Sequence, residues 1–184
     1  MKRAFIIHGW EGTPDSNWFP WLKKELENKG FSVEMPNMPN TMHPKMEEWL
    51  GHLKKVIKSP DENTYLIGHS LGVITILRFL EQLEDQKIGG AVLVAGFSEP
   101  IGYDEINSFF QTPLDYEKVK KAARHFAAIH SDNDPYVPLE QGELLRDKLG
   151  AKLYVMKNAE HLNKGNGQFE LPEALEEILK MSSE

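Results

Sequence analysis

The feature that most constrains the fold is the segment 64–72, which contains an apolar run followed by Gly-His-Ser-Leu-Gly. The apolar run at 65–67 is typical of a short buried strand. The next five residues fit the pattern G-x-S-x-G, and residues 73–80 continue for two turns without Gly or Pro, which predicts a helix. In this context a sharp strand-to-helix turn exposes its central serine at the positive end of the helix. We therefore expect Ser70 to be a nucleophile.

The five-residue pattern has only three fixed positions, so it also recurs by chance. The alternative interpretation is an ordinary turn with a solvated serine. The predicted strand before the pattern and the predicted helix after it favour the nucleophile.

Short apolar segments alternate with amphipathic segments along the chain. Strands that are apolar along their whole length favour a parallel sheet covered by helices on both faces. The sequence thus predicts an α/β three-layer sandwich with a six-stranded parallel sheet. The expected strands are residues 4–7, 31–35, 65–67, 91–95, 126–129 and 152–156, and the expected helices are residues 18–29, 45–58, 73–80, 116–124, 140–149 and 172–181.

Length and composition narrow the class of protein. At 184 residues, without a repeat, linker or low-complexity segment, the chain predicts one domain over residues 1–184. The net charge is −7 and no basic block stands out, which disfavours nucleic-acid binding. The absence of cysteine excludes disulfides, thiolate zinc sites and a cysteine nucleophile.

The start of the chain has a Lys-Arg pair followed by only four apolar residues, which is too short for the apolar region of a signal peptide. No apolar run approaches the length that crosses a bilayer. We expect a cytoplasmic protein that does not act at a membrane.

The polar residues suited to catalysis follow predicted strands, and ligands of open α/β sheets bind at the carboxyl ends of strands. Ser70 follows the third strand, Asp132 and Asp134 follow the fifth, and His161 follows the sixth. The order Ser, Asp, His is that of α/β-hydrolases. We expect His161 to take the serine proton and Asp134 to fix its tautomer, with Asp132 as the alternative acid. The backbone N–H groups of Leu71 and Trp10 would form the oxyanion hole.

The other histidines have simpler interpretations. His69 is expected to pack beside the serine turn, and His130 would be the base only if the last loop pointed away. His161 itself, taken alone, would be an exposed loop histidine. No histidine pair has the spacing of metal ligands, so neither a metal nor a cofactor is expected. The remaining histidines are expected at the surface or at strand edges: His43, His52 and His125.

Aromatic side chains near the strand ends suggest an apolar substrate pocket, to which Phe97, Phe109, Phe110 and Tyr136 would contribute beside Trp10. Phe109 and Phe110 could equally belong to the core beneath a short helix. The loop from 97 to 114 is too short for a cap domain, which predicts an open site and small or flexible substrates.

Seven segments of the sequence together carry a family resemblance: residues 18–26, 37–39, 68–70, 91–94, 109–113, 132–135 and 160–161. On these segments the chain resembles the small cap-less α/β-hydrolases grouped with retinoblastoma-binding protein nine and the bacterial YdeN-type proteins. The resemblance implies a serine hydrolase with a six-stranded parallel sheet, in the expected order 2-1-3-4-5-6, and catalytic positions at Ser70, Asp134 and His161. It does not indicate the physiological substrate.

The expected function is hydrolysis of small carboxylic esters through an acyl-enzyme, with thioesters or amides as related substrates. One alternative is a protein-binding module that keeps the hydrolase fold without turnover. Another is an aminopeptidase or acyl-transferase that uses the same nucleophile. The expected partner is a small-molecule ester or amide, and the sequence indicates no protein partner.

Overall fold

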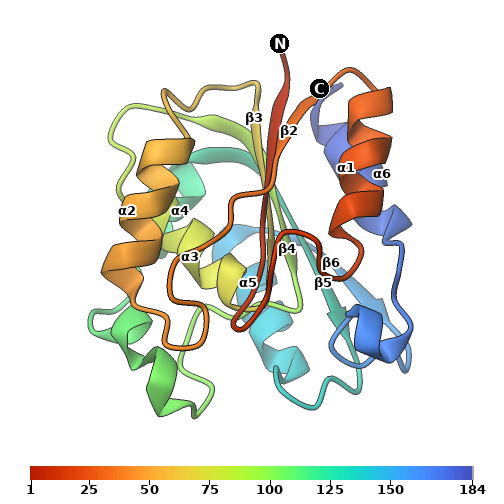
Figure 1. Ribbon diagram of the computed structural model, residues 1–184. Coiled ribbons are helices and arrows are strands. Elements are labelled where there is room, and N and C mark those ends of the chain that lie inside the picture. The colour runs from red at the N-terminus through yellow and green to blue at the C-terminus, as the bar shows by residue number, and fades with distance from the viewer. Residues whose placement is uncertain (184) are drawn as a thin grey trace.

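The computed structural model describes residues 1–183, and its six strands form one parallel sheet in the order β2-β1-β3-β4-β5-β6 (Figure 1). This confirms the predicted fold class and strand order. The strands are β1 (Arg3–Ile7), β2 (Ser32–Glu34), β3 (Thr64–His69), β4 (Ile88–Val94), β5 (Ala123–Ser131) and β6 (Lys152–Met156). The helices are α1 (Phe19–Asn28), α2 (Met46–Val56), α3 (Leu71–Leu80), α4 (Tyr116–Lys121), α5 (Leu139–Leu149) and α6 (Pro172–Met181), with two 3₁₀ helices, η1 (Asp104–Phe110) and η2 (Lys164–Asn166).

Helices cover both faces of the sheet, as the apolar strands predict. Helices α2, α3, α4 and α5 lie on one face, and α1 and α6 lie on the other (Figure 1). Alternate residues of a strand point to opposite faces, so Phe5 and Ile7 enter the first core and Ala4 and Ile6 enter the second. The two cores together shield both faces of the parallel sheet from solvent.

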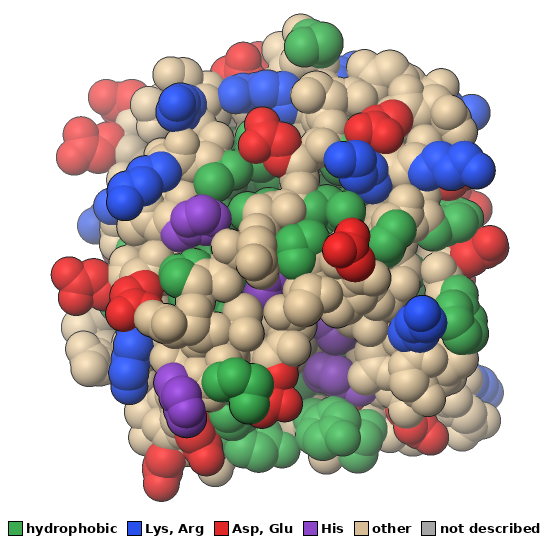
Figure 2. All heavy atoms as spheres, viewed as in Figure 1, with side chains coloured by type: hydrophobic (Ala, Val, Ile, Leu, Met, Phe, Trp, Pro, Cys, Tyr) green, Lys and Arg blue, Asp and Glu red, His purple; other side chains and the backbone are tan. Residues whose placement is uncertain are grey.

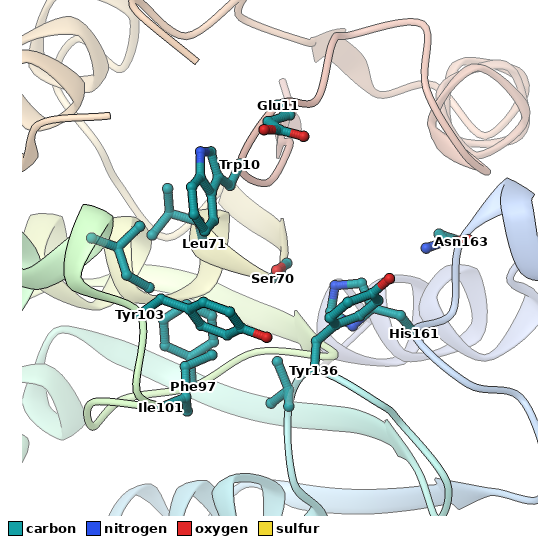
Figure 3. Close-up of a pocket in the computed structure, with 12 residues that line it drawn as sticks. Trp10, Glu11, Ser70, Leu71, Phe97, Ile101, Tyr103, Tyr136, His161 and Asn163 are labelled. Atoms are coloured by element: carbon teal, nitrogen blue, oxygen red, sulfur yellow. The ribbon is translucent and has the colours of Figure 1, made fainter. Parts of the chain in front are cut away.

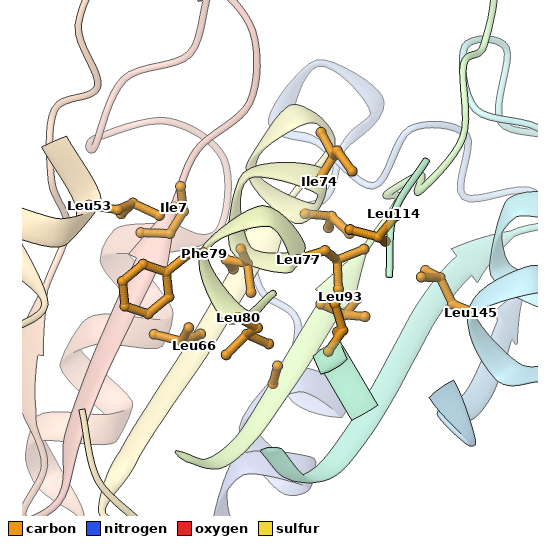
Figure 4. Packing of buried hydrophobic residues seen from close by; sticks show 14 of the residues in the cluster. Ile7, Leu53, Leu66, Ile74, Leu77, Phe79, Leu80, Leu93, Leu114 and Leu145 are labelled. Atoms are coloured by element: carbon orange, nitrogen blue, oxygen red, sulfur yellow. The ribbon is translucent and has the colours of Figure 1, made fainter. Parts of the chain in front are cut away.

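The central helix α3 positions the serine turn. All ten of its residues are buried, and Figure 4 shows its leucine side chains packed against the sheet. A Cβ on Gly72 would lie 2.3 Å from the carbonyl oxygen of Ile7, so only glycine lets α3 approach β1 so closely. The buried Arg78 donates from Nε to the carbonyl oxygen of Phe109 at 3.0 Å, which ties α3 to the end of η1.

The middle of the chain differs from the predicted boundaries. β4 begins at Ile88 rather than at residue 91, because Gly89 and Gly90 belong to the strand instead of preceding it. A Cβ on Gly89 would lie 2.6 Å from the Tyr65 ring, and one on Gly90 would lie 2.5 Å from the Met181 sulfur. These glycines therefore allow close packing against neighbouring side chains rather than forming a turn.

No cap domain covers the sheet in the described part of the chain, and the segment after β4 folds into η1 instead. Among residues 1–183 no helix has the length and apolar character needed to cross a bilayer. On the face seen in Figure 2, acidic and basic side chains are interspersed rather than gathered by sign.

Candidate active site

The serine turn has the backbone geometry of a strained strand-to-helix corner. Ser70 connects β3 to α3 with φ 54° and ψ −119°, a region that residues other than glycine rarely occupy. A Cβ on Gly68 would lie 3.0 Å from the backbone of Gly72, so the two glycines of the pattern allow the chain to fold back on itself. Such strain persists only where the surrounding structure imposes it, which is typical of functional sites.

The structure brings His161 and Asp134 together. The Oδ2 atom of Asp134 lies 2.8 Å from Nδ1 of His161, and their side chains are only 1% and 10% exposed. The other carboxylate oxygen accepts the N–H groups of Tyr136 at 2.9 Å and Val137 at 3.0 Å. Burial alone would raise the pKa of Asp134, but these hydrogen bonds and the neighbouring imidazole outweigh it and lower the pKa.

The alternative acid has a different position. Asp132 is exposed, and its Oδ1 accepts the N–H of Asn158 at 2.8 Å, in the loop that leads to His161. It therefore supports the backbone of that loop rather than the imidazole. Of the two candidate acids, the geometry selects Asp134 as the partner of His161.

Ser70 and His161 line the same pocket, with a volume of about 380 Å³, at the carboxyl edge of the sheet (Figure 3). Trp10 and Leu71, the expected sources of oxyanion-hole donors, line it as well. The loop that carries Trp10 lies directly against the serine, because a Cβ on Gly9 would approach the Ser70 Cβ to 3.0 Å. The predicted nucleophile, base and both donor residues thus surround one space.

A buried histidine that the sequence interpretation left without a role holds this loop. His8 Nε2 accepts the N–H of Met38 at 3.0 Å, so the proton lies on Nδ1, which donates to the carbonyl oxygen of Gly9 at 2.8 Å. Burial is the main cause of a lowered pKa for His8, which keeps the ring neutral. The pattern His-Gly after the first strand was the only available signal for this arrangement.

Of the aromatic residues proposed for the pocket beside Trp10, two line the cavity, and the two that could equally belong to the core do not. Phe97 and Tyr136 line the pocket. Phe109 is fully buried in the core, where it packs against Trp49, and Phe110 lies behind Phe97 with its ring centroid 6.0 Å away. Both residues lie at the end of the 3₁₀ helix η1, and neither side chain lines the pocket. The lining residues that the prediction missed are Glu11, Ile101, Tyr103, Ile106, Val137 and Asn163.

His130 is not a candidate base. Its ring is fully buried on the α5 face, where a Cβ on Gly142 would lie 2.8 Å from it, and neither ring nitrogen has a hydrogen-bond partner within residues 1–183. Burial lowers the pKa of His130 to about 4. His43 is exposed, while His52 and His125 are partly exposed. In the described chain, no three His, Asp or Glu side chains are grouped as metal ligands would be.

Known proteins are similar to this chain over most of its length. A family model described as "Serine hydrolase" matches residues 4–180. The putative hydrolase YdeN of Bacillus subtilis strain 168 is 38% identical over 173 residues, which cover 93% of this chain and 91% of YdeN. The serine hydrolase RBBP9 of Rattus norvegicus is 29% identical over 164 residues, 86% of each protein.

Solved structures give the same result for the fold. The crystal structure of the B. subtilis ydeN product superimposes with a TM-score of 0.96 at 35% identity, over 100% of both chains. Est1E from Butyrivibrio proteoclasticus superimposes with a TM-score of 0.78 at 16% identity, over 100% of this chain and 89% of Est1E. The second likeness concerns the fold alone.

Proposed function

The chain belongs to the serine hydrolase family, and from that premise we propose that it hydrolyses small carboxylic esters, and by the same route thioesters or amides, through an acyl-enzyme on Ser70. One observation carries the proposal. Ser70 and His161 line one pocket, and Nδ1 of that histidine is 2.8 Å from the buried carboxylate of Asp134.

In the proposed acylation, the Ser70 Oγ attacks the carbonyl carbon while His161 Nε2 takes its proton. Asp134 accepts the Nδ1–H of His161, which leaves Nε2 unprotonated in the resting state and stabilises the imidazolium that forms. Collapse of the tetrahedral intermediate breaks the bond to the leaving group, which receives the proton from Nε2. Water then attacks the acyl-enzyme by the same steps, releases the acid and restores Ser70.

The negative charge of the tetrahedral intermediate needs hydrogen-bond donors. We assign this role to the backbone N–H groups of Leu71 and Trp10. Leu71 is the first residue of α3, where backbone N–H groups have no partner within the helix and the helix dipole is positive. The close approach of Gly9 to Ser70 brings the Trp10 backbone to the same side of the pocket.

The pocket indicates the size and polarity of the acyl group. The leaving group must face His161, which protonates it, so the acyl group extends to the opposite side of Ser70. There the pocket is lined by apolar side chains that include Phe97 and Ile101 (Figure 3). A volume of about 380 Å³ without a cap suits a small apolar acyl group, and the proposed partner is accordingly a small-molecule ester or amide.

Turnover of p-nitrophenyl acetate tests the proposal. Wild-type protein should show turnover, and Ser70→Ala should lower kcat by at least about 10³-fold, since the nucleophile is lost. Ser32→Ala, at an exposed position of β2, is the matched control and should keep wild-type kinetics. Equal kcat for wild type and Ser70→Ala would refute the assignment of the nucleophile.

A further inference from the structure

The loop that carries His161 has a strained backbone. Asn158, Glu160 and Leu162 all have positive φ, at 53°, 47° and 49°, although none is glycine. Left-handed conformations are unfavourable for such residues and persist only where contacts impose them. The conformation of this loop therefore depends on what holds it from outside.

One side of the loop is held by side chains at the end of β5 and just after it, which accept hydrogen bonds from backbone N–H groups of the loop. Asp132 accepts from Asn158, Ser131 Oγ accepts from Ala159 at 3.0 Å, and Asn133 Oδ1 accepts from Glu160 at 2.8 Å. These bonds orient the loop as it leaves β6. None of these bonds involves His161 or Leu162, and the carbonyl oxygens of these two residues have other donors.

The other side is held by two aromatic N–H groups. Nε2 of His69 lies 2.9 Å from the carbonyl oxygen of His161, and Trp18 Nε1 donates to the carbonyl oxygen of Leu162 at 2.9 Å. A carbonyl oxygen only accepts, so Nε2 of His69 must carry the ring proton. His69 is 4% exposed and its ring packs edge-on against His161, with centroids 4.9 Å apart.

Two features keep His69 in the neutral form that this bond requires. Burial, helped by the neighbouring His161, lowers the pKa of His69 to about 3. The rings of Trp18 and Phe19 pack edge-on against it, with centroids 6.1 Å and 6.0 Å away. The imidazole is thus a fixed neutral donor at neutral pH.

We propose that His69 is a positioning residue for the reaction, and that its Nε2–H sets the place of the His161 backbone relative to Ser70. His69 directly precedes Ser70 in the chain, so a single hydrogen bond connects the side chain next to the nucleophile to the backbone of the base. Trp18 assists at the next residue of the loop. This inference rests on the proposed function, because it assumes that His161 is the base.

Three substitutions distinguish the effect of the His69 hydrogen bond on activity from the effect of its packing. His69→Gln places an amide N–H where Nε2 lies, His69→Asn places it nearer the backbone at the position of Nδ1, and His69→Leu removes the donor. With p-nitrophenyl acetate, we expect His69→Leu and His69→Asn to lower kcat about 10- to 100-fold with KM within about two-fold, since misplacement of a reacting group has effects of this size. His69→Gln should stay within about five-fold of wild type, because its N–H reaches the same carbonyl.

Trp18→Phe keeps a ring and removes only the N–H, and should lower kcat about three- to ten-fold, since Leu162 is one residue beyond the base. Urea unfolding of all four variants shows whether stability follows the same order. A packing role would lower activity in proportion to stability and would give Gln and Asn the same loss. That result, or wild-type kcat in His69→Leu, would overturn the proposal.

A measurement independent of turnover separates this inference from the proposed function. Long-range ¹H–¹⁵N NMR correlations of the wild-type protein report which nitrogen of His69 is protonated. The Nε2–H form is expected, and the Nδ1–H form would overturn the inference. Absence of turnover in wild-type protein together with the Nε2–H form would instead refute the proposed function.

Discussion

The two walls of the pocket are built by different kinds of contact. The polar wall consists of Ser70 and His161, with Asp134 behind them, and hydrogen bonds between distant segments hold it. The apolar wall, formed by side chains such as Trp10 and Tyr103, is held mainly by packing, with those two ring centroids 5.9 Å apart, although Trp10 Nε1 also donates to the carbonyl oxygen of Met42 at 3.2 Å. The remaining apolar lining includes Phe97, Ile101 and Ile106.

The difference follows from what each wall has to do. Proton transfer requires donor and acceptor within about 3 Å and in line, and only directional bonds hold atoms that closely. An apolar wall needs the right shape, and volume-conserving changes in such a wall are tolerated. Substitutions in the polar wall should therefore abolish catalysis, whereas those in the apolar wall should change which substrate is preferred.

The largest effect is expected from the acid of the polar wall. Asp134→Asn should lower kcat/KM about 10³- to 10⁴-fold, because an amide that donates to Nδ1 forces His161 into the wrong tautomer. Asp132→Asn is the matched control, since its side-chain oxygen can still accept the N–H of Asn158, and it should lose less than about ten-fold. Steady-state hydrolysis of p-nitrophenyl acetate measures both, and equal losses would contradict the different roles assigned to the two acids.

The next largest effect is on the pH dependence of stability, and it is expected from His130, a buried histidine outside both walls. The folded-state pKa of His130, about 4, lies below the ordinary value of 6.5, so its contribution to stability is complete above pH 6.5 and is lost as the pH falls toward 4. His130→Leu removes this proton uptake and fills a similar volume. Between pH 7 and pH 5 the wild-type protein should lose about 2 kcal/mol of unfolding free energy that the variant keeps.

Urea unfolding of both proteins at pH 7 and pH 5 measures this difference in unfolding free energy. A His130→Leu variant with wild-type pH dependence would contradict this, because it would mean that the buried ring binds its proton as readily in the native state as in the unfolded state.

The two buried histidines should also differ in their effect on activity. The His69 ring has a hydrogen-bond partner in the described chain and the His130 ring has none, so His69→Leu should lower kcat while His130→Leu leaves it unchanged.

The smallest effect is expected from the apolar wall. Ile101→Ala enlarges the proposed acyl side of the pocket and Ile101→Trp reduces it. The ratio of kcat/KM for p-nitrophenyl hexanoate to that for the acetate should rise with Ala and fall with Trp, each by about ten-fold, the usual effect of one or two methylenes. Val155→Ala, on the edge strand β6, is the control that should leave the ratio unchanged. A large loss of acetate turnover in Ile101→Ala would show that the apolar wall also positions the reacting groups.

The sequence predicts the polar wall better than the apolar wall, for a physical reason. The turn around Ser70 needs glycine at two fixed positions, so it is visible in a short pattern. A Cβ on Gly68 would meet the backbone of Gly72, and one on Gly72 would meet the backbone of Ile7 in β1. Asp134 and His161 follow strands, and the parallel sheet brings strand ends to one edge. Even so, the sequence left Asp132 as an alternative, which only the fold excludes.

The apolar wall depends on contacts that no local pattern encodes. Phe109 and Phe110 are adjacent in the sequence, but a 3₁₀ turn tied to Arg78 decides that neither faces the pocket. The two glycines of β4 are a second example. A Gly-Gly pair is typical of a turn, but in this fold it lies within the strand and allows close packing against Tyr65 and Met181. Tertiary contacts override local composition in both segments.

The central claim is that Ser70 is the nucleophile of this site, and covalent labelling tests it most directly. The protein is treated with a fluorophosphonate, digested, and analysed by peptide mass spectrometry, beside Ser70→Ala. The account predicts one adduct, on the Ser70 oxygen, and none in the variant. An adduct on another residue of wild-type protein, or equal labelling of Ser70→Ala, would contradict it.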